Sequence, residues 1–199
     1  MELIVMNESS NCFVYETDRD LEALLLSDAE DDVIWDIIYS RFHFVADSYH
    51  TEHRFDLYVP FVIDVSHIVY SIEKVIPDDE QPMNRILLSL FSVLFEKGYS
   101  IYAFDWNHDC YRFSPDAYTS DGHALEKHSV SRDCNMYYPS FYPNGDYHFF
   151  VEKDFRFGIL GHPWRQEMWV FGEQLIPLIE HYAEEMNWEE LRRVPTIPS

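Results

Sequence analysis

The segment Phe104–Phe113, FDWNHDCYRF, holds the densest group of side chains that could do chemistry. Asp105, His108 and Asp109 lie within five residues, and carboxylate and imidazole groups bind divalent metal ions. A strand that ends near Asp105 could aim two of them at one ion. A metal site needs three or four convergent ligands, however. The spacing therefore favours a simpler interpretation, in which Asp105 and Asn107 organise a turn through hydrogen bonds from side chain to backbone.

A second candidate is His162, which lies in the segment Gly161-His162-Pro163-Trp164. A histidine exposed at a hairpin tip could act as a general base or bind a metal. The segment is better explained as a turn between strands, because glycine tolerates positive φ and Pro163 sets the φ needed at the second position of a type I turn. We expect Trp164 to fold back over the sheet and to be largely buried.

Other chemical motifs are missing from the sequence. No HExxH or HxxxH pattern occurs, and His123, His128 and His148 are too scattered to assign to a metal. The six glycines form neither GxGxxG nor a P-loop, so nucleotide binding has no support. We therefore predict no metal, no cofactor, no catalytic residue and no enzymatic activity. The alternative that stays open is a small metal-dependent hydrolase that would use Asp105, His108, Asp109 and His162.

The formal net charge is −22, from 36 acidic and 14 basic residues. This charge repels nucleic acid and anionic membranes and attracts cationic surfaces. The segment Glu16–Asp36 is the most acidic, with nine carboxylates and one arginine. We expect it to bind a cationic protein partner. The candidate partner-binding residues are Glu16, Asp18, Asp20, Glu22, Asp28, Glu30, Asp31, Asp32 and Asp36. Trp35, Tyr39, Tyr49 and Tyr58 lie in or near this segment in sequence and could anchor a partner.

The elements that would position these residues follow from the apolar spacing. Two short helices are predicted within an acidic helical portion over residues 1–40, and Ser27 or Asp28 would cap the second. Residues 54–70 predict one or two strands broken near Pro60. A continuous apolar stripe predicts a long helix over residues 82–97 that ends at Gly98.

The second half of the chain alternates strands and turns. Strands are predicted over 99–106 and 110–113, on both sides of Lys153-Asp154, and over 167–171, followed by a C-terminal helix over 174–188. This order predicts a single α+β domain over residues 1–199. Its sheet, over residues 41–199, would be antiparallel or mixed, with the helices segregated to one face.

Cysteine usage and hydropathy bear on the compartment. Cys12, Cys110 and Cys134 are odd in number and show no CxxC spacing, which suits a reducing compartment. The neighbours of Cys110 indicate a small buried hydrophobe rather than a nucleophile. The first residues lack a basic region and a cleavage site, and no run reaches about 18 apolar residues. We expect a cytoplasmic protein that binds neither membrane nor nucleic acid.

Four segments of residues 99–176 resemble a known family. They are a DWxHxxY-like segment in YAFDWNHDCYRF, a P-x-G-D-Y turn in YPNGDYHFF, the GHPW turn, and VFGEQL before the last helix. In this order they resemble the small bacterial families typified by the domain of unknown function 2716. That label carries no activity, so no catalytic residue can be transferred. Genes of such families often accompany polymorphic toxin systems. The resemblance therefore implies an immunity protein that neutralises a toxin by occluding its basic surface.

Overall fold

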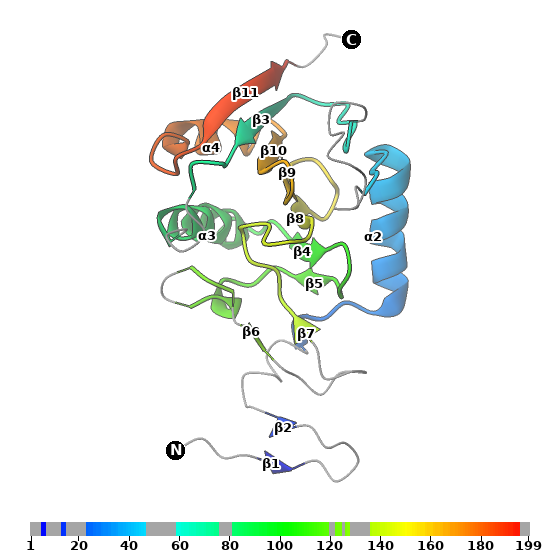
Figure 1. Ribbon diagram of the computed structural model, residues 1–199. Helices are drawn as coiled ribbons and strands as arrows, with labels where there is room; N and C mark the ends of the chain where they lie inside the picture. Colours follow the sequence, from blue (N-terminus) through cyan, green and yellow to red (C-terminus); the bar gives the residue numbers. More distant parts are fainter. Residues whose placement is uncertain are drawn as a thin grey trace.

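A seven-stranded antiparallel sheet forms the centre of the fold, with strand order β11-β3-β10-β9-β8-β4-β5 (Figure 1). The computed structural model describes residues 5–6, 13–14, 23–46, 59–75, 81–119, 122–124, 126–127 and 136–195. The seven strands are β3 (His67–Ser71), β4 (Ile101–Asp105), β5 (Tyr111–Arg112), β8 (His148–Glu152), β9 (Gly158–His162), β10 (Glu167–Phe171) and β11 (Glu189–Val194). The α+β class and the antiparallel sheet are confirmed.

Helices cover both faces of this sheet. Helices α3 (Gln81–Glu96) and α4 (Ile176–Tyr182) contribute to one hydrophobic core, and α2 (Asp28–Arg41) contributes to the other (Figure 1). The expected placement of all helices on one face is therefore corrected. The reason lies in α2 itself, because Ile34 and Ile38, four residues apart, form an inner stripe that is buried against the second face.

Helix α3 confirms the long helix expected over residues 82–97. Its apolar stripe is buried, as the spacing predicted, and consists of Met83, Leu87, Leu90, Phe91 and Leu94. Gly98 follows the helix at φ 84°, a left-handed conformation that glycine adopts without steric cost.

The C-terminal helix is shorter than predicted. Helix α4 ends at Tyr182, residues 183–187 form turns, and the chain then enters the edge strand β11. Met186 and Trp188 are nevertheless buried in the same core as α4. The apolar residues of the turn therefore follow the same spacing as those of the helix. For this reason the sequence pattern predicts a helix that is longer than the one that forms.

The predicted strands over residues 54–70 also differ from the structure. Only β3 forms, and residues 59–66 have no strand, while residues 54–58 lie outside the described part of the chain. Two backbone hydrogen bonds instead join the segments 42–46 and 59–63. The Val45 N–H donates to the Pro60 carbonyl at 3.1 Å, and the Val62 N–H donates to the Phe42 carbonyl at 2.7 Å. The first of the two predicted acidic helices lies largely outside the described residues.

The remaining described elements are small. They are β1 (Val5–Met6) paired with β2 (Phe13–Val14), the 3-10 helix η3 (Pro115–Ala117), and β6 (Glu126–Lys127) paired with β7 (Met136–Tyr137). None of the described helices is long and apolar enough to cross a bilayer.

Aromatic packing fixes α2 to the sheet. Trp35 contacts the rings of Phe104 and Phe149 edge-on, with centroids 5.4 and 5.7 Å away. Those two rings stack on each other across β4 and β8 at 4.8 Å. Such contacts add to the gain from apolar burial. They hold the inner face of α2 on the sheet, so Asp28, Asp32 and Asp36 lie on the outer side.

Candidate functional site

The outer face of α2 carries part of the predicted partner-binding set. Asp28, Asp32 and Asp36 are exposed and follow each other at four-residue spacing along one helix face. We call these three residues the acidic stripe. The predicted residues Glu16, Asp18, Asp20 and Glu22 lie outside the described part of the chain.

Two further members of that set interact within the protein. Glu30 forms the capping box of α2, in which it accepts the Ser27 backbone N–H at 3.0 Å, and it pairs with Arg112 at 2.8 Å. Ser27 is thus the N-cap, one of the two caps that the sequence predicted. Asp31 is half-buried beside Cys110, and burial raises the pKa of its carboxyl, helped by the charges of Asp109, Asp32 and Asp28.

Exposed apolar side chains lie on α2 and on the segments that follow it. Val33 and Tyr39 on α2 are 57% and 49% exposed. Val45, Val59 and Val62, from the two segments that follow α2 and hydrogen-bond each other, are exposed as well. Of the aromatic anchors expected from the sequence, Trp35 is packed between α2 and the sheet, whereas Tyr39 reaches solvent.

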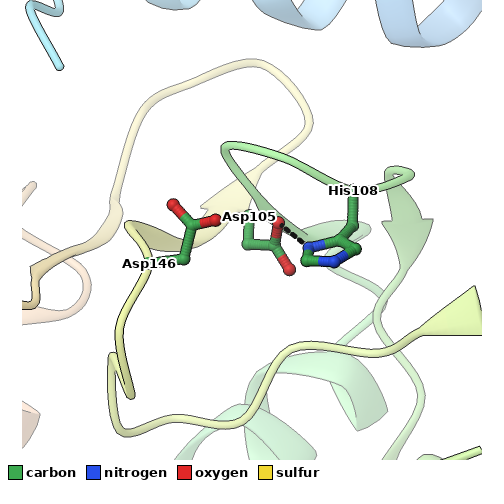
Figure 2. Close-up of side chains that lie close together, drawn as sticks. All are labelled: Asp105, His108 and Asp146. Carbon is green, nitrogen blue, oxygen red and sulfur yellow. Dashed lines mark hydrogen bonds and ion pairs between the residues drawn. The ribbon is translucent and has the colours of Figure 1, made fainter. Parts of the chain in front are cut away.

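A second cluster lies at the end of the paired strands β4 and β8. Asp105 ends β4, His108 lies in the connection to β5, and Asp146 precedes β8. One possible metal-ligand atom from each of these residues lies within 4.8 Å of the other two. Figure 2 shows the Asp105 carboxylate between the Asp146 carboxylate and the His108 ring.

Hydrogen bonds hold this cluster in place. The His108 Nδ1–H donates to Asp105 Oδ1 at 2.7 Å, and the Asn107 backbone N–H donates to the same oxygen at 3.0 Å. The second bond is the turn contact that the sequence predicted. The Asn107 side-chain amide donates to Asp146 Oδ2, and the Tyr147 backbone N–H donates to Asp146 Oδ1 at 2.8 Å.

Burial differs strongly within the cluster. The Asp105 side chain is fully buried, whereas the His108 side chain is 39% exposed. The hydrogen bond to Asp105 raises the pKa of His108, and burial raises the pKa of Asp146, with the Asp105 charge acting in the same direction. The site therefore concentrates negative charge and opens to solvent beside the histidine ring.

The other residues of the hydrolase alternative do not join this cluster. Asp109 is exposed and is not one of the three residues whose ligand atoms converge. His162 is fully buried in β9, and its Nε2 lies 3.3 Å from the Tyr147 hydroxyl. Tyr147 belongs to the core that contains α2. Asp105 lies on the same face of β4 as Ile101 and Ala103, which belong to the opposite core. The histidine expected at an exposed hairpin tip is therefore a buried residue on the other face of the sheet.

The turn interpretation of the GHPW segment is confirmed. Gly161 and His162 end β9, residues 163–166 form the turn, and β10 begins at Glu167. Trp164 is half-buried rather than largely buried, and its ring contacts Tyr147 edge-on at 5.3 Å. Cys110, by contrast, is buried as expected, and burial raises the pKa of its thiol far above the ordinary value.

Sequence reasoning missed Asp146. The sequence indicates only that this aspartate belongs to the P-x-G-D-Y turn, but the pairing of Asp105 with His148 brings that turn beside the end of β4. A signal was present, because a turn directly before a strand that pairs with β4 must lie near the residues that end β4.

These features define an α+β protein with an acidic helix on one face of its sheet and a carboxylate–histidine cluster at one end. The chain belongs to the family described as "Protein of unknown function (DUF2716)", whose model matches residues 25–176. It is also 37% identical over 96 residues to a Bacillus subtilis (strain 168) protein named "Uncharacterized protein YxiI". That match covers 48% of this chain and 52% of the relative, so the chain spans about half the length of the curated relative. No solved structure matches the chain significantly.

Proposed function

We propose that this chain is a binding protein that captures a cationic protein partner through the acidic stripe of α2. The stripe itself carries the proposal. Like charges four residues apart destabilise a helix by about 0.2–0.5 kcal/mol per pair, so Asp28, Asp32 and Asp36 repel one another in the free protein. A partner with lysine or arginine side chains opposite them removes that repulsion.

The neighbours of the stripe support this proposal. Val33 and Tyr39 are exposed on the same helix as the carboxylates, so α2 offers a partner apolar as well as charged side chains. Tyrosine side chains are enriched among the residues that contribute most binding energy at protein interfaces. The net charge of −22 also raises the association rate with a basic partner through long-range attraction.

Within this class, we infer an immunity protein that neutralises a cognate bacterial toxin by occluding its basic active-site or substrate surface. Family membership supports this narrower function, since families of this type often accompany toxin genes. Charge supports it too, because a toxin that acts on nucleic acid needs a basic groove, which carboxylates on a helix can fill. The hydrolase alternative has weaker support, because only Asp105 and His108 of its four residues lie together.

The experiment that tests this function uses the gene beside the one for this chain. We predict that the neighbour encodes a secreted protein whose basic C-terminal domain stops bacterial growth when it is expressed inside the cell. Co-expression of this chain should restore growth, and the two purified proteins should form a stable complex. Continued growth arrest despite expression of the folded chain would contradict the proposal.

A further inference from the structure

We propose that Asp105, His108 and Asp146 bind a divalent first-row transition-metal ion, such as Zn²⁺ or Mn²⁺, at the end of the β4–β8 strand pair. This site is separate from the acidic stripe and does not depend on the partner proposed above. It replaces the expectation from the sequence that no metal is bound.

The first argument is the unmatched oxygen of Asp105. Its Oδ1 atom accepts two hydrogen bonds, whereas its Oδ2 atom is buried and has no hydrogen-bond partner among the described residues. The carboxylate as a whole is fully buried. A buried carboxylate oxygen without a partner costs free energy, and such an atom calls for an ion or water to satisfy it. A role in organising the turn accounts for Oδ1 alone.

A second buried carboxylate at the other end of the same strand pair shows the contrast. Glu152 of β8 pairs with Ile101 and is 1% exposed. Both of its oxygens accept hydrogen bonds. Oε1 accepts one from the Arg156 guanidinium at 2.8 Å, and Oε2 accepts one from Arg156 Nε at 3.1 Å and one from the Asp154 backbone N–H at 3.0 Å. The fold thus supplies hydrogen-bond donors to both oxygens of Glu152 but to only one oxygen of Asp105 among the described residues.

The second argument is the ligand set. Two carboxylates and one imidazole form a mixed oxygen and nitrogen set that suits Zn²⁺ or Mn²⁺ better than Mg²⁺, which prefers oxygen ligands. Because a ring nitrogen binds a metal only without its proton, the ion takes His108 Nε2, or it takes Nδ1 after the proton on Nδ1 is released and the hydrogen bond to Asp105 is lost. Ligands about 2.0–2.2 Å from a tetrahedral ion lie about 3.3–3.6 Å apart. Because the three atoms already lie within 4.8 Å of one another, side-chain shifts on the order of 1 Å complete the site. Three protein ligands leave positions open for water on the exposed side of His108.

The third argument is the connectivity of the ligands. Asp105 ends β4 and His108 lies in the β4–β5 connection, while Asp146 comes from the turn before β8. An ion held by all three would tie together two loops that are distant in sequence. Binding should therefore raise the thermal unfolding midpoint as well as give a binding signal.

The test uses the full chain, stripped of metal with a chelator and titrated calorimetrically with Zn²⁺ or Mn²⁺ in excess Mg²⁺. The Mg²⁺ occupies unspecific acidic sites. We expect one ion per chain, and at least about tenfold weaker binding in each of the variants Asp146→Asn and His108→Gln. The matched control is Asp109→Asn, which removes the same charge from a nearby exposed residue and should bind as the unchanged protein does.

Thermal unfolding provides the second measurement. Zn²⁺ or Mn²⁺ should raise the midpoint of the unchanged protein and of Asp109→Asn, but not that of Asp146→Asn. The half-buried position of Asp146 tolerates a neutral amide, so this variant should fold. The proposal is overturned if Mg²⁺ abolishes binding of both metals, or if Asp146→Asn and Asp109→Asn bind them equally.

Discussion

Gly161 of β9 lies directly against Pro143, so closely that a Cβ atom at Gly161 would come within 3.1 Å of the proline Cβ. Gly161 belongs to the GHPW segment, and Pro143 begins the turn that contains Asp146. Two of the segments that carry the family resemblance therefore contact each other, and this contact helps to position Asp146 beside Asp105.

Replacement of Gly161 by alanine should disturb this contact. The new methyl group pushes Pro143 outward, and overpacking of this kind costs about 1–3 kcal/mol. We expect a lower unfolding midpoint and weaker Zn²⁺ binding, since Asp146 lies in the displaced turn. The change Pro143→Gly provides the control in a double-mutant cycle. Gly161→Ala should cost less in that background, and an equal cost in both backgrounds would show that the contact has no role.

The ion pair between Arg156 and Glu152 should be important for stability. Arg156→Met leaves the buried Glu152 carboxylate without its guanidinium, and an unpaired buried charge is strongly destabilising. We expect the unfolding midpoint to fall far more than in Arg85→Met, because the exposed Arg85 donates only a long 3.4 Å hydrogen bond to the Gln81 carbonyl within the described part of the chain. Adding Glu152→Gln to Arg156→Met should recover part of the loss. No recovery in the double variant would contradict this role.

Asp31 should lower stability at neutral pH. Burial raises the pKa of its carboxyl in the folded protein, so the folded state holds this proton more tightly than the unfolded state does. The stabilising contribution is therefore complete below the ordinary pKa of 3.8 and is lost as the pH rises through the higher folded value. Asp31→Asn should unfold at a higher temperature than the unchanged protein at pH 7, and this gain should shrink in acid.

The control for Asp31 is its exposed neighbour Asp32. Asp32→Asn removes the same charge from an exposed position, where the charge carries no cost of burial. Its gain in unfolding temperature should therefore be smaller. Thermal unfolding of both variants from pH 3 to pH 8 provides the comparison. Equal gains at every pH would mean that general charge repulsion, rather than the burial of Asp31, limits stability.

Much of the fold could be predicted because its central elements repeat a strong pattern. The stripe from Met83 to Leu94 and Gly98 gave both ends of α3 to within one residue. Edge strand β11 was missed because its side chains are mostly exposed, so its sequence EELRRV shows no alternation of apolar and polar residues. The end of α4 was missed for the opposite reason, since Met186 and Trp188 continue the apolar spacing beyond the helix.

In the candidate sites too, contacts between residues close in sequence could be predicted, whereas contacts that depend on strand pairing could not. Asp105 and His108 are three residues apart, so local spacing was sufficient to pair them. Asp146 reaches them only through the pairing of β4 with β8, and the burial of His162 depends on which face of β9 it occupies. Both facts follow from tertiary structure. For α2, the sequence predicted an acidic helix but could not show that Glu30 forms an ion pair with Arg112 or that Asp31 lies half-buried beside Cys110.

The measurement that tests the central claim is the association rate of this chain with the basic toxin domain encoded beside it. The stripe variant carries Asp28→Asn, Asp32→Asn and Asp36→Asn. The control carries Glu173→Gln, Glu184→Gln and Glu185→Gln, which remove the same charge from exposed residues around α4, on the other face of the sheet. Both variants should first be shown to fold by circular dichroism.

The association rate is then measured by stopped-flow fluorescence over a range of salt concentrations. If the acidic stripe binds the partner, the rate of the stripe variant at low salt falls by about tenfold or more and loses most of its salt dependence, while the control stays close to the unchanged protein. Equal rates for the stripe variant and the control would contradict the account, because net charge alone would then explain the association.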